Sequence, residues 1–219
     1  MKPIVIAIDG PSGAGKGTIA RTISARLGYR HVDTGAMYRA VAWKALHDGV
    51  AVDDEATVTA LADRSPIVVE GGIISIDGHE VTTAIRTPEI DKAAAAVARL
   101  PGVRAVLVAR QRALGRDGGV VMEGRDIGTV VFPHADVKIY LDASAEERAR
   151  RRANDPAHTG SQSGQAAVAA AIQARDTSDT TRAASPLTRA ADAVHIDTTS
   201  MPVDAVVERV LELVRSKIR

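Results

Sequence analysis

The fold is decided by one stretch near the start of the chain, Gly10-Pro11-Ser12-Gly13-Ala14-Gly15-Lys16-Gly17-Thr18. It follows a β-branched run, Ile4 to Ile8, that predicts a buried strand, and it precedes apolar residues at helical spacing. Glycines let a backbone bend closely round a ligand, and the free N–H groups at a helix start attract anions. The stretch therefore predicts a phosphate-binding loop, in which Lys16 supplies a cation to the β- and γ-phosphates of a nucleotide.

This loop departs from the G-x-x-x-x-G-K-[ST] pattern at one position. Gly17 follows Lys16, and the hydroxyl comes one residue later, at Thr18. We therefore expect no direct metal ligand, and Mg²⁺ held through water near Thr18. A tight strand–helix connection without a ligand is the alternative. A guanine-binding switch protein is disfavoured because Asn154, the one asparagine, lacks the Lys that would follow it in Asn-Lys-x-Asp.

The composition bounds the kind of protein. Of 219 residues, 45% are hydrophobic and only 2% aromatic, so Val, Ile, Leu and Ala must build the core, which suits parallel strands under helices. There is no Cys, which excludes disulfides and thiolate metal sites. A net charge of +1 argues against nucleic acid as a partner. The first apolar run ends at Asp9, too soon for a signal peptide or a membrane span, so we expect a cytoplasmic protein without a membrane partner. We also expect a monomer.

Strands and helices alternate along most of the chain. Short apolar runs at His31 to Asp33, Val120 to Met122, Val137 to Leu141 and Ala193 to Ile196 predict further strands between helical segments. Such alternation predicts a single three-layer α/β domain over residues 1–219, with a parallel sheet flanked by helices.

One region breaks this alternation. The favoured hairpin turns Gly71-Gly72 and Asp77-Gly78 separate short apolar runs and predict a small antiparallel insertion. Farther on, the polar stretch from Asn154 to Gly164 predicts a mobile loop. The expected division is a core of 1–62, 115–147 and 183–219, an insertion of 63–114 and a helical lid of 148–182.

The helix expected after Ser144 is rich in arginine. Ser144 and Glu147 match the capping-box pattern at its start. Its arginines are Arg148, Arg150, Arg151 and Arg152. Beside a Gly/Pro-containing loop, such a helix can close over phosphates and exclude water, although a basic solvent-exposed face is the alternative. Arg148 and Arg152 share a face and are, with Lys16, the candidate catalytic residues; the spacing leaves open which arginine touches phosphate.

Three further stretches complete a pattern: Asp33-Thr34-Gly35-Ala36-Met37-Tyr38-Arg39, Gly124-Arg125-Asp126-Ile127-Gly128-Thr129, and Arg175-Asp176-Thr177-Ser178-Asp179-Thr180-Thr181-Arg182 with Ser185-Pro186-Leu187. Together with the phosphate loop, and in this order, they closely resemble the bacterial cytidylate kinases, which are nucleoside monophosphate kinases of the P-loop class. The resemblance covers almost the whole chain, and the β insertion looks like that family's extended monophosphate-binding region. It implies ATP with Mg²⁺ as phosphoryl donor, CMP or dCMP as acceptor, and ADP with CDP or dCDP as products.

The resemblance also implies which residues bind the acceptor. Arginines are suited to its phosphate because a guanidinium donates in a planar, bidentate way. A carboxylate can accept from the cytosine amino group, and an arginine can donate to the acceptors beside it. The implied residues are Arg39, Arg125 and Arg182 on the phosphate, Asp126 and Arg104 on the base, and Arg175 and Asp179 on the ribose, with Thr34 as a further substrate-binding residue.

Structural alternatives to these roles exist, and one feature departs from the family. Asp126 could cap a helix, and Asp179 could be the i,i+4 partner of Arg175. The family pattern usually has a hydroxyl residue near Ala95, nine residues before Arg104, whereas residues 93–96 are all alanine. One hydrogen bond to the base is therefore missing or supplied elsewhere, which leaves the selectivity between cytosine and uracil open.

Two other functions compete with a nucleotide kinase of this kind. A P-loop kinase for another small acceptor, such as shikimate or a coenzyme A precursor, would share the phosphate loop, but the arginine-rich acceptor half and the β insertion argue against a neutral acceptor. A regulatory module would bind ATP and phosphorylate no acceptor.

Overall fold

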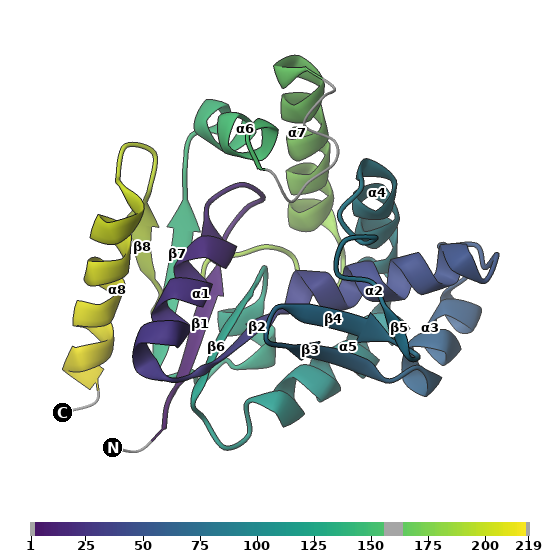
Figure 1. Ribbon diagram of the computed structural model, residues 1–219, viewed down its shortest axis with the longest axis horizontal. Helices are drawn as coiled ribbons and strands as arrows, with labels where there is room; N and C mark the ends of the chain where they lie inside the picture. Colours follow the sequence, from purple (N-terminus) through teal and green to yellow (C-terminus); the bar gives the residue numbers. More distant parts are fainter. Residues whose placement is uncertain (1–2, 156–163, 218–219) are drawn as a thin grey trace.

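The structure is a computed structural model that describes residues 3–155 and 164–217. Its main sheet has five parallel strands in the order β2-β6-β1-β7-β8 (Figure 1). These strands are β1 (Val5–Asp9), β2 (Arg30–Asp33), β6 (Val120–Gly124), β7 (Val137–Asp142) and β8 (Val194–Asp197). The helical elements are α1 (Lys16–Leu27), α2 (Thr34–His47), α3 (Glu55–Arg64), α4 (Pro88–Val97), α5 (Pro101–Leu114), the π-helical turn η1 (Ile127–Val131), α6 (Ala145–Ala153), α7 (Gln165–Thr181) and α8 (Val203–Lys217).

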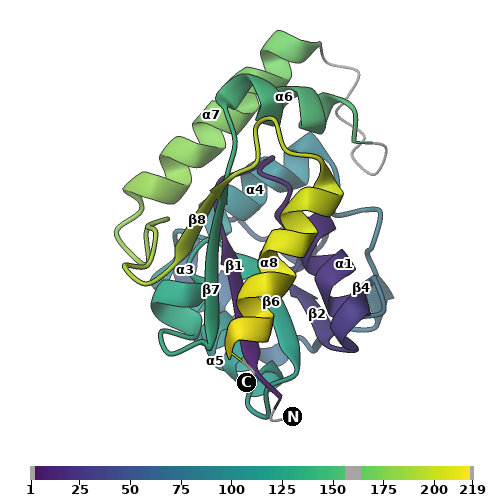
Figure 2. The same cartoon turned by 90° about the vertical axis from the view of Figure 1, so that its left-hand side faces the viewer.

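Alternation along β1 sorts the core onto two faces of the sheet. Ile6 and Ile8 pack on the face that α1 and α8 cover (Figure 2). Val5 and Ala7 lie on the other face, with η1 and part of α5. Because side chains alternate along a strand, both faces of a central strand must be apolar to be buried. Helices on both faces confirm the predicted three-layer fold.

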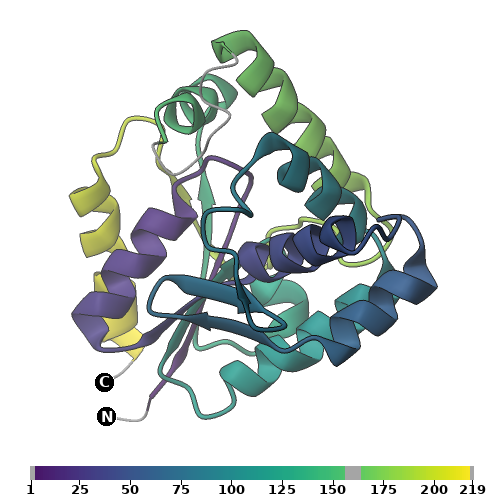
Figure 3. The same ribbon diagram turned by 45° about the vertical axis from the view of Figure 1, so that its right-hand side comes forward.

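The predicted antiparallel insertion is a second, three-stranded sheet, β3 (Ile67–Glu70), β4 (Ile73–Ile76) and β5 (His79–Glu80). It lies beside α2 and α3 (Figure 3) and contributes Ile74 and Ile76 to a separate apolar cluster built mainly by α2, α3, α4 and α5. The helix α3 is not among the predicted elements, although Val58, Leu61 and Ala62 give it a buried stripe at helical spacing.

The helices α6 and α7 lie over the end of the sheet toward which β7 points (Figure 1). Half of the predicted capping box forms, because Ser144 Oγ accepts from the Glu147 amide at 3.2 Å. The Glu147 carboxylate does not return the bond; it pairs with Arg150 and Arg151 instead. Of the mobile loop predicted from Asn154 to Gly164, residues 156–163 lie outside the described part. None of the described helices is long and apolar enough to span a bilayer.

Candidate active site

The phosphate loop connects β1 to α1, as predicted. Lys16 folds back over it, so that its buried Nζ donates to the Pro11 carbonyl at 2.6 Å. Burial, and then the positive charge of Arg125, lower the pKa of Lys16 to about 7. Gly13 has a φ of +80°, and a Cβ there would lie 2.8 Å from the Arg148 carbonyl, so the loop needs glycine where α6 approaches.

Three arginines of α6 contact this loop. Arg148 Nη1 donates to the Ser12 carbonyl at 3.0 Å, and Arg152 Nη2 donates to Ser12 Oγ at 3.1 Å. Arg151 Nη1 reaches the Ala14 carbonyl at 3.4 Å. The exposed basic face proposed as an alternative is therefore wrong for these three side chains, while Arg150 is exposed and pairs with Glu147. Arg151 is a contact that the sequence reasoning did not select.

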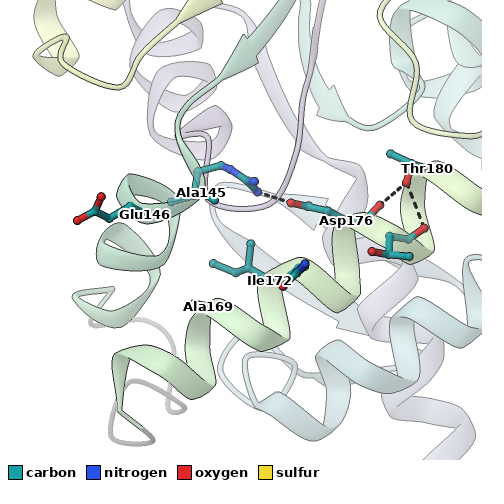
Figure 4. A pocket seen from close by; sticks show the side chains of 9 residues that line it. Ala145, Glu146, Ala169, Ile172, Asp176 and Thr180 are labelled. Atoms are coloured by element: carbon teal, nitrogen blue, oxygen red, sulfur yellow. Dashed lines mark hydrogen bonds and ion pairs between the residues drawn. The ribbon is translucent and has the colours of Figure 1, made fainter.

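Asp176 of α7 also reaches the loop. Its carboxylate accepts from the Ser12 amide at 3.2 Å and pairs with Arg148. The pair lies at a pocket of about 490 Å³ between α6 and α7, whose lining includes Glu146 and Ile172 (Figure 4). The sequence pattern indicates no role for Asp176, because its partner Ser12 is 164 positions away in the chain.

The acceptor-side residues form two groups of ion pairs near the carboxyl ends of β2 and β6, one round Asp33 and one round Asp126 and Asp179. In the two groups together six arginines share three aspartates, so these nine residues carry a net charge of +3. The pairs are Arg39 and Arg86 with Asp33, Arg104 and Arg182 with Asp126, and Arg125, Arg175 and Arg182 with Asp179. We call these nine residues the arginine network. Arg86 and Asp33 are members that the sequence reasoning missed.

Three of these arginines have buried nitrogen atoms without a hydrogen-bond partner: Arg39 Nε, Arg104 Nε and Arg182 Nη2. A buried donor left unpaired is costly, which makes each of them a ready site for an anion's oxygen. Burial, and then the positive charge of Arg104, lower the pKa of Arg182. Its charged form is therefore destabilised, and an anion bound beside it would stabilise that form.

The three aspartates of the network differ in the groups that they contact. Burial alone would raise the pKa of Asp179, but Arg125 and Arg175 hold it below its ordinary value. The i,i+4 contact of Asp179 with Arg175 exists, at 3.3 Å, beside a shorter bond from Arg125 at 2.8 Å. Asp126 precedes η1 but makes no capping bond, so that alternative is wrong, and it pairs directly with Arg104. Asp33 instead caps α2 by accepting from the Ala36 amide at 3.0 Å.

The two halves of the site are adjacent. The charges of Arg125 and Asp179 both shift the pKa of Lys16. Thr34 Oγ1 donates to the Glu123 carbonyl at 2.7 Å and so lies at the end of β6, between the halves. Ala95 lies half-buried on α4, while Thr18 is exposed on α1. A donor phosphate chain on the loop would therefore face an anion held by the arginine network.

Two strand-end carboxylates were missed by the sequence reasoning. Asp9 ends β1 and accepts from the amides of Ile127 and Gly128. Glu123, on β6, pairs with His31 at 2.9 Å, and its Oε1 lies 3.2 Å from where a Cβ of Gly17 would be. A polar residue that ends a buried apolar run is the signal that could have marked both. No group of three potential metal-ligating side chains occurs within residues 3–155 and 164–217.

Comparison with known proteins agrees with this geometry. The family model described as cytidylate kinase matches residues 6–216. A cytidylate kinase of Solibacter usitatus (strain Ellin6076) is 49% identical, over 99% of this chain and 94% of that protein. Another, of Pelotomaculum thermopropionicum (strain DSM 13744 / JCM 10971 / SI), is 52% identical, over 94% of this chain and 93% of that protein.

Solved structures share the fold at low sequence identity. A gluconokinase from Sinorhizobium meliloti 1021 superposes with a TM-score of 0.52 at 15% identity, covering 99% of this chain and 94% of its own. A shikimate kinase from Bacteroides thetaiotaomicron superposes with a TM-score of 0.50 at 12% identity, covering 97% and 98%. At such identities the likeness concerns the fold alone.

Proposed function

The chain belongs to the cytidylate kinase family, and on this premise we propose that it transfers the γ-phosphoryl group of ATP to CMP or dCMP, giving ADP and CDP or dCDP. The observation that carries the proposal is the arginine network beside the phosphate loop. Six arginines on three aspartates leave a surplus of positive charge, which suits the phosphate of a nucleoside monophosphate. A neutral acceptor would give that surplus no partner, and a monocarboxylate such as shikimate would neutralise less of it than a phosphate.

On the donor side, residues 10–18 would hold the ATP phosphates. Phosphoryl transfer depends mainly on alignment and on neutralising charge, and little on covalent chemistry by the protein. Lys16 would neutralise the β- and γ-phosphates. Arg148 and Arg152, with Arg151 beside them, already contact the loop and would approach the transferring group from α6. Their closure would exclude water and so limit hydrolysis of ATP.

Mg²⁺ would accompany ATP, and the residues present fit a water-mediated site. Gly17 stands where many phosphate loops have a hydroxyl, and the Glu123 carboxylate lies against that space. Thr18 and Glu123 are the residues that would hold the hydrated ion, since Mg²⁺ keeps several waters and binds few protein ligands. When bound, the ion would neutralise charge on the donor phosphates.

On the acceptor side, Arg39, Arg125 and Arg182 would bind the CMP phosphate, next to Thr34. The unpaired nitrogens of Arg39 and Arg182 support this role. Asp126 and Arg104 are paired with each other, and cytosine would enter by exchanging that pair for bonds to its amino group and its acceptors. Arg175 and Asp179 would bind the ribose in the same way.

The division of the domain also belongs to this proposal. Residues 63–114 would act as the monophosphate-binding insertion and residues 148–182 as the lid, on the core made of the remaining segments. A cytoplasmic location and a monomeric state stay predictions from the sequence.

A coupled assay tests the function. The protein is incubated with Mg-ATP and, separately, with CMP, dCMP, UMP, AMP, shikimate or no acceptor, and ADP formation is followed. We expect CMP and dCMP to give turnover well above the acceptor-free background. No ADP above background with CMP would refute the proposal, and ATP binding without turnover on any acceptor would favour the regulatory module.

A further inference from the structure

Asp9 joins the phosphate loop to the acceptor segment through its side chain. It is the last residue of β1 and directly precedes Gly10. Its Oδ1 accepts from the Ile127 amide at 2.8 Å, and its Oδ2 accepts from the Gly128 amide at 2.7 Å. Both carboxylate oxygens are therefore bonded to η1, and only 5% of the residue is exposed.

The two residues between the anchors of Asp9 belong to the arginine network. The pairing of β1 with β6 ends where Asp9 lies opposite Gly124. The chain then passes through Arg125 and Asp126 and returns to the Asp9 carboxylate at η1. Arg125 and Asp126 are thus held from both sides by the residue that directly precedes the phosphate loop.

Burying the Asp9 carboxylate costs free energy that an apolar side chain at this position would not cost. It lies on the face of β1 that carries Val5 and Ala7, where an apolar side chain would continue the core. Burial raises the pKa of Asp9 to about 6, with Asp126 adding to the shift, while its two backbone bonds and Lys16 oppose it. A buried carboxylate is retained where two amides must be held at once, since its two oxygens accept both bonds.

We propose that Asp9 is a positioning residue for the phosphoryl transfer, which fixes Arg125 and Asp126 relative to the phosphate loop and so sets the separation of donor and acceptor phosphates. This inference rests on the proposed function. Misplacement of reacting groups by about 1 Å can cost on the order of a hundredfold in rate, so a carboxylate that touches neither substrate can control turnover.

The test substitutes Asp9→Asn, which keeps the shape but leaves one amide facing an NH₂ group. We expect kcat with CMP to fall roughly tenfold to a hundredfold. The affinity for ATP, measured by calorimetry, should stay within about twofold, because the loop residues are unchanged. The matched control is Asp142→Asn at the end of the neighbouring strand β7, where the carboxylate accepts from the adjacent Ala143 amide at 2.8 Å and lies 4.0 Å from His195. This control should keep wild-type turnover.

The pH profile separates positioning from a role in stability alone. The titratable groups that face Asp9 are Lys16, Asp126, and Tyr140 and Lys138 of β7. In the wild type, kcat/KM for CMP should fall below about pH 6 with the loss of two ionised groups, Asp9 and the CMP phosphate, whose second pKa is also about 6. In Asp9→Asn only the phosphate titrates. The limiting slope of log kcat/KM against pH on the acid side should therefore drop by one. A purely structural role leaves that slope unchanged.

A second variant covers the case in which Asp9→Asn does not fold. Gly128→Ala would place a Cβ 3.3 Å from Asp9 Oδ2 and should lower kcat more weakly, with an unchanged pH slope because Asp9 still titrates. Wild-type kcat and slope in a folded Asp9→Asn, or wild-type kcat in Gly128→Ala if Asp9→Asn does not fold, would overturn the inference and leave the function intact. A wild type that binds CMP without turnover overturns the function, and positioning is then judged by CMP affinity, which Asp9→Asn should weaken at least about fivefold. Absence of CMP binding to the wild type would overturn both.

Discussion

Lys16 titrates near neutrality, which makes the pH dependence of nucleotide binding a test of its role. Burial, with Arg125 nearby, lowers its pKa to about 7, whereas ATP requires the protonated form. We expect the affinity for a non-hydrolysable ATP analogue to weaken as the pH rises from 7 to 9, approaching about tenfold per pH unit. Calorimetric titrations at pH 7, 8 and 9 measure this. A pH-independent affinity would contradict the assignment.

Stability should respond to Lys16 in the opposite direction. The folded pKa of Lys16 is below its unfolded value of 10.5, so the unfolded chain binds more protons between pH 7 and 10 and the stability contribution rises with pH. Lys16→Met should remove the pH dependence of both nucleotide affinity and stability, and should greatly reduce turnover. Lys16→Arg stays charged, so the affinity for the ATP analogue should no longer change between pH 7 and 9. Near-normal turnover of Lys16→Met would refute the phosphate-loop assignment.

We expect Ala95 to be a position at which a hydroxyl would improve recognition of the base. Adding a hydroxyl with Ala95→Ser should raise the ratio of kcat/KM for CMP over UMP about threefold to tenfold, since a net hydrogen bond contributes about 1 kcal/mol. Ala96→Ser, equally half-buried one helical step away, is the control and should leave the ratio unchanged. Parallel kinetics with CMP and UMP decide; an equal effect of both variants would mean that the hydroxyl does not reach the base.

At this scale the sequence predicted the residues whose chemistry is carried by local motifs. Lys16, Arg125 and Arg182 lie where their motifs suggested. Arg86 was missed because its pairing with Asp33 joins segments distant in sequence. Asp9 was missed because its partners are backbone amides 118 and 119 positions away, which no side-chain pattern reveals.

At the scale of elements, we expect α7 to affect ATP binding through Asp176. Its carboxylate occupies the Ser12 amide and Arg148, two donors that the ATP phosphates would use. Asp176→Asn should therefore tighten ATP binding, by roughly threefold to tenfold for a partly exposed charge. Calorimetry measures the change. Glu146→Gln removes a carboxylate from the same pocket without a loop contact and should have little effect; weaker ATP binding in Asp176→Asn would show that the carboxylate chiefly supports Arg148.

Prediction of elements succeeded where local signals determine them. The hairpin turns of the insertion formed as expected. The docking of α6 on the phosphate loop was predicted only in outline. Arg151 is held there by Thr198, near the far end of the chain, through bonds of 2.9 and 2.7 Å. Such a contact depends on tertiary packing and has no local signature.

Over the whole molecule, charge is distributed very unevenly. The chain carries a net charge of only +1, yet the arginine network holds three excess positive charges. Arg39 and Arg104 of this network lie on helices packed round the apolar cluster of α2–α5, and Arg175 and Asp179 lie on α7. The phosphate loop adjoins the separate cluster under α1 and α8. A ligand that binds both regions should therefore stabilise the molecule as a whole.

Thermal unfolding with CMP tests this distribution of charge. At a hundred times its dissociation constant a ligand adds about 2.7 kcal/mol, which corresponds to a Tm increase of about 5–10 °C for a domain of this size. We expect the shift to shrink as NaCl rises from about 0.05 to 0.5 M, because salt screens the guanidinium–phosphate attraction. Cytidine, which lacks the phosphate, should give little shift at the same concentration.

Arg125→Gln should lose most of the Tm increase that CMP causes, while Arg116→Gln, which is exposed and outside the network, should keep it. Equal shifts with cytidine and CMP would mean that the arginine network does not bind the phosphate.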